Sequence, residues 1–179
     1  MPRIFVAALL PDHIKKEISR VLLKGDDSFS GVRWENSKKV HITLKFAGSV
    51  KDNTKDDILC KVKKIANIAQ PIKLRFSHID AFPDFRKPRV LVLMLSKSKN
   101  LNDLFTSIEE ELCEMGIAKE ERNFMPHITI GRIKKGFRIK EKKLKIDKKE
   151  FVIDCIAVVK SELKREGSEY INLGVYKLS

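Results

Sequence analysis

The stretch Pro126 to Arg132, PHITIGR, decides the interpretation of this chain, because the segment His41 to Leu44, HITL, repeats its middle. The two copies of His-x-Thr lie 86 residues apart. The strands expected before them keep the same offset, since RIFVAALL begins at Arg3 and RVLVLMLS begins at Arg89. The order of strand, helix, loop and His-x-Thr strand also repeats, which indicates an internal duplication.

The pattern of apolar residues extends this order along the chain. Helices are expected at 11–25, with Asp12 as its N-cap, at 52–70, and at 100–116, with Asn100 as its N-cap. Strands are expected at 3–10, 72–82, 89–95 and 124–132, and a further strand at 40–48 is expected to be entered through Trp34. The chain is expected to end in a hairpin with arms 151–163 and 170–178.

Strands joined by hairpin-length links, with helices following them in each half, are typical of an α+β fold. We therefore expect one domain over residues 1–179, built from two lobes related by a pseudo-two-fold axis. Each lobe should be an antiparallel sheet with helices on its outer face, and the active-site cleft should lie between the lobes.

The charge balance favours a polyanionic partner. The chain has 37 Lys and Arg against 24 Asp and Glu, a formal net charge of +13. The three cysteines, Cys60, Cys113 and Cys155, are widely spaced, which argues against disulfides and a zinc site and favours the cytoplasm. The apolar run Ile4 to Leu10 is too short to span a membrane, although a signal peptide is an alternative interpretation of it.

The two motifs carry the chemistry. Along a strand side chains alternate, so His41 and Thr43 share one face, as do His127 and Thr129. If the lobes meet about a two-fold axis, these faces look at each other across the cleft. In-line displacement at phosphorus needs a base beside the attacking oxygen and an acid beside the leaving oxygen, and two imidazoles can supply both. The threonine hydroxyls and Arg132 could bond the remaining phosphate oxygens, so no metal or cofactor is required.

Several residues have two interpretations. Phe46 and Trp34 could stack on a base or belong to the core. The basic run Lys134 to Lys149 could bind RNA phosphates or be a solvated edge. His13 is expected on the surface, whereas His78 could line the cleft. Zinc is a rival use of the two histidines, but neither HITLKFAG nor HITIGRIKK offers a third ligand at suitable spacing.

With these residues in place, the chain resembles the two-histidine phosphoesterases, and specifically the RNA 2′,3′-cyclic phosphodiesterases of the 2′-5′ RNA ligase family. The likeness runs nearly end to end, through RIFVAALLP, VRWENSKKVHITLKFAG, FMPHITIGR and KSELKREGSEYINLGVYKL. It implies a bilobal α+β fold and hydrolysis of a terminal 2′,3′-cyclic phosphate on RNA to a 2′-phosphate.

The resemblance also implies roles for residues. It gives His41 as the general acid that protonates the departing 3′ oxygen and His127 as the general base for water. It gives Thr43 and Thr129 as ligands of phosphate oxygens. Arg132 matches the family's phosphate-contacting arginine, and Phe46 matches a position near the bound nucleoside.

The expected partner is RNA with a 2′,3′-cyclic phosphate end, with tRNA and tRNA halves among the candidates, and no membrane or obligatory protein partner is expected. The same site could join RNA ends through a 2′-5′ linkage if a hydroxyl end replaced water. Two alternatives stay open: an RNA or nucleotide binding module with little turnover, and a phosphodiesterase for another cyclic or 2′-5′ linked nucleotide.

Overall fold

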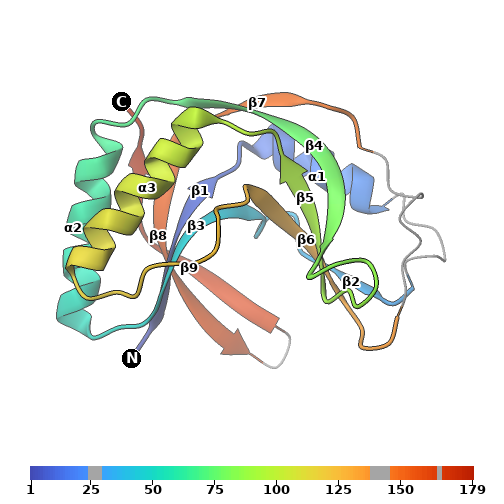
Figure 1. Ribbon diagram of the computed structural model, residues 1–179, viewed down its shortest axis with the longest axis horizontal. Coiled ribbons are helices and arrows are strands. Elements are labelled where there is room, and N and C mark those ends of the chain that lie inside the picture. Colours follow the sequence, from blue (N-terminus) through green and yellow to red (C-terminus); the bar gives the residue numbers. More distant parts are fainter. Residues whose placement is uncertain (24–29, 138–145, 165–166) are drawn as a thin grey trace.

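The computed structural model describes residues 1–23, 30–137, 146–164 and 167–179 (Figure 1). Along these residues the elements are β1 (Arg3–Leu9), α1 (Asp12–Leu23), β2 (Val32–Trp34), β3 (His41–Ser49), α2 (Asp52–Ala66), β4 (Ile72–Phe82), β5 (Val90–Leu95), α3 (Lys99–Glu114), β6 (His127–Ile133), β7 (Glu150–Ile153), β8 (Cys155–Lys164) and β9 (Gly167–Lys177). All strand pairings are antiparallel, so the α+β expectation is confirmed.

Two half-sheets meet along the strands that carry the repeated motif. The strand order is β7-β4-β5-β6-β3-β1-β8-β9, with β2 on β6. The central strands β3 and β6 pair only through Ile42 and Ile128 within the described register. The sheet therefore divides at its centre into one half with β1, β3, β8 and β9 and another half with β2, β4, β5, β6 and β7.

The helices cover the two halves unequally. In Figure 1, α2 and α3 lie together at one side of the molecule, and they contact β3, β8 and β9. Helix α1 lies toward the other side of the molecule in the same view, and its Glu17 pairs with Lys149, just before β7, at 3.4 Å. Ile14, Ile18 and Leu22 recur every fourth residue on α1 and are buried, which explains why this segment forms an amphipathic helix. No helix within the described residues is both long and apolar enough to cross a membrane.

Helix ends differ from the expectations by a few residues. The expected N-cap Asn100 is wrong, because the Ser98 hydroxyl accepts the Leu101 N–H at 3.3 Å and α3 begins at Lys99. Asp12 is the first residue of α1 and does not precede it. Helix α2 ends at Ala66, earlier than the expected position before Pro71. Strand β4 occupies the expected range 72–82.

Three strand expectations need correction. Segment Val32–Trp34 does not lead into the motif strand but pairs with β6 as a separate strand. The first arm of the expected terminal hairpin splits at Asp154, since β7 pairs with β4 while β8 pairs with β1 and β9. The alignment of RIFVAALL with RVLVLMLS is wrong by one residue, because Thr43 faces Ala7 whereas Thr129 faces Val92.

Candidate active site

The antiparallel register of β3 and β6 brings the two motifs together. Ile42 lies opposite Ile128, and both side chains are fully buried on the core side. In antiparallel pairing the next residues in one strand face the previous residues in the other. His41 is therefore level with Thr129, and His127 is level with Thr43. Each imidazole thus has a threonine of the other half beside it.

Both histidines are held in the same way. The Nδ1 atom of His41 lies 2.8 Å from the carbonyl oxygen of Lys39, and that of His127 lies 2.7 Å from the carbonyl oxygen of Met125. A carbonyl oxygen can only accept, so Nδ1–H donates in both rings. In a neutral ring Nε2 is then the unprotonated nitrogen, which is the atom available as a base. The two-residue spacing to the carbonyl is another feature that the two motifs share.

The surroundings of the two rings shift their titration. Burial lowers the pKa of both His41 and His127 from the usual 6.5. At His41 the hydrogen bond to Lys39 and the negative charge of Glu35 act in the opposite direction, and the nearby His127 lowers the pKa further. Glu35 therefore favours a protonated His41, and among the described residues no carboxylate raises the pKa of His127 in this way. The electrostatics of the two motifs are not equivalent.

Aromatic side chains pack on each imidazole, and the sequence interpretation missed them. Phe5 stacks on His41 with ring centres 4.9 Å apart, and Tyr170 meets the same ring edge-on at 5.4 Å. Phe82 meets His127 edge-on at 5.0 Å. Phe5 lies in β1 and Tyr170 lies in β9. Their closeness to His41 depends on the pairing of β1 with β3 and of β9 with β8, which joins distant parts of the sequence. These contacts restrict the orientation of both rings.

A bulge follows each motif at the same place. The register between β1 and β3 skips Leu44, and the register between β5 and β6 skips Ile130. A bulge reverses the alternation of side chains beyond it. Phe46 and Arg132 consequently point to the same side as the histidines, and Phe46 is 70% exposed. The interpretation of Phe46 as a core residue is therefore wrong.

Arg132 is oriented by a carboxylate of its own half of the sheet. Its Nε donates to Glu35 Oε1 at 3.2 Å, and Tyr170 of the other half lines the same cavity as Arg132. Burial raises the pKa of Tyr170, so this hydroxyl stays protonated at neutral pH. The guanidinium is thus oriented while half of its side chain remains exposed.

Two neighbouring cavities open on the histidines. A cavity of about 280 Å³ is lined by His41, and a cavity of about 710 Å³ is lined by His127. Four residues line both cavities, and they are the ones expected to contact the phosphate and the nucleoside: Thr43, Phe46, Thr129 and Arg132. The structure thus brings all six expected site residues to one cleft. A phosphorus atom near the shared residues would have one imidazole on each side.

A buried ion pair supports the floor of the larger cavity. The first residue after the bulge in β3, Lys45, turns toward the core, where its Nζ lies 2.7 Å from Glu109 Oε1 and 2.8 Å from Oε2. The same Nζ donates to the carbonyl oxygen of Ala118 at 2.6 Å, and Oε2 also accepts the Glu120 N–H at 3.1 Å. The pair therefore joins β3, α3 and the loop that leads to the second motif.

The remaining expectations lie outside the two cavities. His13 is exposed on α1, as expected. His78 lines neither cavity, because a register shift between Phe76 and Ile79 turns it to the surface. Trp34 packs on Gly131 and not over either cavity. In the basic run Lys134 to Lys149, positions 138–145 lie outside the described residues. Within the described part of the chain no group of three His, Cys, Asp or Glu side chains could hold a metal ion.

Comparison with known proteins gives relatives along nearly the whole chain. The "RNA 2′,3′-cyclic phosphodiesterase" of Methanocaldococcus jannaschii is 34% identical, with 94% of this chain and 96% of the relative covered. The protein of the same name from Aquifex aeolicus is 27% identical, with 94% and 93% covered.

Solved structures show the same fold. A crystal structure of a Thermus thermophilus protein matches with a TM-score of 0.86 at 24% identity, covering 98% of this chain and 97% of that one. Escherichia coli LigT in complex with 3′-AMP matches with a TM-score of 0.81 at 21% identity, covering 100% and 99%. The family model described as "2′-5′ RNA ligase superfamily" matches residues 10–165. The chain therefore belongs to the 2′-5′ RNA ligase superfamily.

Proposed function

We propose that this protein is an RNA 2′,3′-cyclic phosphodiesterase that leaves a 2′-phosphate, and that His41 and His127 are its acid and base. The observation that supports this most directly is the matched pair of imidazoles. Each ring has its Nδ1 tied to a backbone carbonyl, and each lines one of two cavities that share four polar or aromatic residues. The relatives named RNA 2′,3′-cyclic phosphodiesterase support the same activity.

In the proposed reaction a water oxygen attacks phosphorus while His127 Nε2 takes a proton from that water. The bond between phosphorus and the 3′ oxygen breaks, and protonated His41 gives its Nε2 proton to that oxygen. The ester bond to the 2′ oxygen remains, so the product is a 2′-phosphomonoester. The proton balance is restored when His127 loses and His41 gains a proton from solvent. Acid and base are assigned to the two histidines by the family resemblance.

Charge on the non-bridging oxygens grows as the reaction proceeds. The Arg132 guanidinium and the hydroxyls of Thr43 and Thr129 are the groups proposed to bind these oxygens. Because these donors and the two imidazoles supply every proton and charge that the displacement needs, the proposed mechanism is independent of metal. We expect turnover to be unchanged by EDTA.

A second candidate activity is formation of a 2′-5′ linkage. The cavity beside His127 measures about 710 Å³, which is far more space than an attacking water needs and lies in the range of small-molecule sites. A ribose 5′-hydroxyl in this cavity could replace water as the nucleophile. His127 would then take the hydroxyl proton, and the product would be a 2′-5′ phosphodiester.

The test is a substrate panel with matched histidine variants. Oligoribonucleotides ending in 2′,3′-cyclic phosphate are incubated with the protein, and products are compared with 2′- and 3′-phosphate standards. His41→Ala and His127→Ala should each reduce kcat by about 10²- to 10⁴-fold, the usual contribution of an acid or base. His13→Ala, at an exposed position, is the control and should retain full activity.

Full activity in either motif variant would contradict the proposed mechanism. Tight binding of the cyclic-phosphate RNA without any release of phosphomonoester would instead identify the protein as a binding module. Turnover of other cyclic or 2′-5′ linked nucleotides in preference to RNA ends would change the proposed substrate while keeping the two-histidine chemistry.

A further inference from the structure

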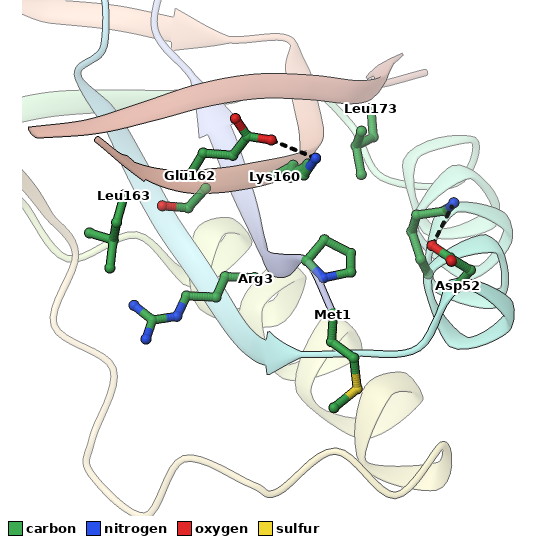
Figure 2. Close-up of a pocket in the computed structure, with 10 residues that line it drawn as sticks. Met1, Arg3, Asp52, Lys160, Glu162, Leu163 and Leu173 are labelled. Carbon is green, nitrogen blue, oxygen red and sulfur yellow. Dashed lines mark hydrogen bonds and ion pairs between the residues drawn. The ribbon is translucent and has the colours of Figure 1, made fainter. Parts of the chain in front are cut away.

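A third cavity, of about 640 Å³, lies at the outer end of β1 (Figure 2) and shares two lining residues with the cavity of His41. Its walls come from the first residues of the chain, the start of α2 and the β8–β9 ribbon. Arg3 and Ser161 line both this cavity and the one beside His41. These two residues are also paired across β1 and β8, so the boundary between the cavities is a single rung of the sheet.

Arg3 stands one step from the aromatic ring that packs on His41. Alternate residues of a strand share a face, so Arg3 and Phe5 point to the same side of β1, about 7 Å apart along the strand. Phe5 stacks on His41. A chain that leaves the His41 cavity along β1 would therefore meet Arg3 first.

Among the described residues, Arg3 is the side-chain cation of this cavity that has no counter-ion. Lys160 pairs with Glu162 at 2.6 Å, and Lys55 pairs with Asp52 at 3.4 Å. Figure 2 draws both pairs with dashed lines, whereas the Arg3 side chain extends away from them and makes no such contact. Because the guanidinium is also exposed, it is available to bind an anion with two parallel hydrogen bonds.

The charges on the other side chains of the cavity balance. Its two lysines are compensated by carboxylates, and Pro2, Leu163 and Leu173 add apolar surface. Leu163 is 69% exposed, which is high for a leucine in a strand. One unpaired arginine next to apolar surface suits a nucleotide, because the phosphate needs a positive charge and the base needs an apolar surface to pack on.

The proposed reaction fixes the direction in which the substrate leaves the site. The 3′ oxygen departs toward His41, so the ribose lies on the His41 side of the phosphorus. The 5′ side of that ribose, which carries the link to the preceding nucleotide, must leave through the same cavity. We propose, resting on the function proposed above, that Arg3 binds the phosphate linking the last two nucleotides and that the cavity in Figure 2 holds the preceding nucleotide.

This arrangement would make the protein selective for a polynucleotide end over a mononucleotide. The test uses a nucleoside 2′,3′-cyclic phosphate without a 5′-phosphate, and di- and trinucleotides with the same cyclic end. The wild-type protein should have a higher kcat/KM for the dinucleotide than for the mononucleotide. Arg3→Gln should raise KM for the dinucleotide about tenfold, in keeping with loss of one charge-assisted contact, and leave the mononucleotide unchanged.

Two further readouts separate phosphate binding from a general effect. The slope of log KM against log salt concentration for the trinucleotide should become shallower by about 0.7 in Arg3→Gln, the value for one phosphate contact on a single strand. Arg20→Gln, an equal charge change at an exposed site on α1, is the matched control and should change neither KM nor slope. Leu163→Asp should weaken binding of the dinucleotide, because the new carboxylate repels the phosphate. The neutral Leu163→Asn should weaken binding much less.

The proposal is overturned if the dinucleotide gives no advantage in the wild type, or if Arg3→Gln changes the mononucleotide and the dinucleotide equally. It is also overturned if Arg20→Gln has the same effect as Arg3→Gln. Turnover of the mononucleotide tests the proposed function by itself. If the wild type turns over no substrate, that function fails, and binding of 3′-phosphorylated di- and mononucleotides to the same variants still decides the role of Arg3.

Discussion

Breaking the buried ion pair between Lys45 and Glu109 should destabilise the protein strongly. Both side chains are only 3% exposed, and the ammonium lies within 2.8 Å of both carboxylate oxygens. Lys45→Met leaves the Glu109 carboxylate buried with only the Glu120 N–H as a described hydrogen-bond donor. An uncompensated charge of this kind costs about 3–5 kcal/mol. For a protein of 179 residues, that corresponds to a decrease in Tm of about 10 °C.

The assay is urea unfolding of Lys45→Met, Glu109→Leu and the double variant, followed by circular dichroism. The double variant removes both charges and retains apolar volume, so it should recover most of the free energy of unfolding that either single variant loses. Lys61→Met is the control, because it breaks an ion pair between Lys61 on α2 and Glu111 on α3, the helix that carries Glu109, at a partly exposed site. Its cost should stay below about 1 kcal/mol.

Two results would refute the reasoning. Single variants within about 1 kcal/mol of the wild type would show that the pair contributes no more than an exposed one. A double variant as unstable as the sum of the single variants would show that the two side chains act independently. The pair also holds the carbonyl of Ala118, so Lys45→Met should loosen the loop before His127 and increase amide hydrogen exchange there.

Four other predictions concern the cleft and its surroundings. Since burial lowers the pKa of both His41 and His127, and the reaction needs one protonated and one neutral ring, kcat/KM should be greatest below pH 6.5 and fall on both sides, as stopped assays across pH would show. The same lowered values mean that protonation destabilises the native state, so the free energy of unfolding should decrease as pH falls below 6.5; a constant value from pH 7 to 5 would contradict this. Gly131→Ala places Cβ 2.7 Å from Val32 Cγ1 and should cost about 1–3 kcal/mol of the free energy of unfolding, measured in urea. Gly48→Ala is the comparison, because residue 48 has a left-handed backbone but no atom close enough to clash with a new Cβ. Tyr170→Phe removes a hydroxyl that lines the same cavity as Arg132 and should lower kcat/KM about fivefold with an unchanged Tm; an unaltered kcat/KM would exclude a role for the hydroxyl.

The sequence predicts the elements of this fold well because their patterns are local. Strand β4 alternates between buried and exposed residues over most of its expected range, and α1 shows its apolar stripe in four-residue steps. Helix starts were less predictable, because Ser98 and Asn100 are both good caps and tertiary packing selects between them. The split of the last hairpin at Asp154 depends on pairing with β4, which lies far earlier in the chain.

The site was predictable where alternation holds and not where it fails. His41, Thr43, His127 and Thr129 follow the period of two, so their common face could be read from the sequence. The bulges at Leu44 and Ile130 then reverse the pattern, and nothing local in the sequence marks them. Lys45 would share the cleft face under strict alternation, but it is buried. Phe5 reaches His41 through the pairing of β1 with β3, and Tyr170 reaches it through the pairing of β9 with β8 and of β8 with β1, which is long-range information.

The position of Trp34 gives this protein a built-in optical signal. It is the single tryptophan of the chain, and its Cε3 lies 3.2 Å from the position that a Cβ at residue 131 would occupy. Its partner in β6 is Gly131, which precedes Arg132, and Glu35 follows it in sequence. Arg132 and Glu35 are paired with each other at the cleft. Occupation of the cleft by phosphate or nucleotide should therefore alter indole emission, so that ligand titrations and stopped-flow kinetics need no label.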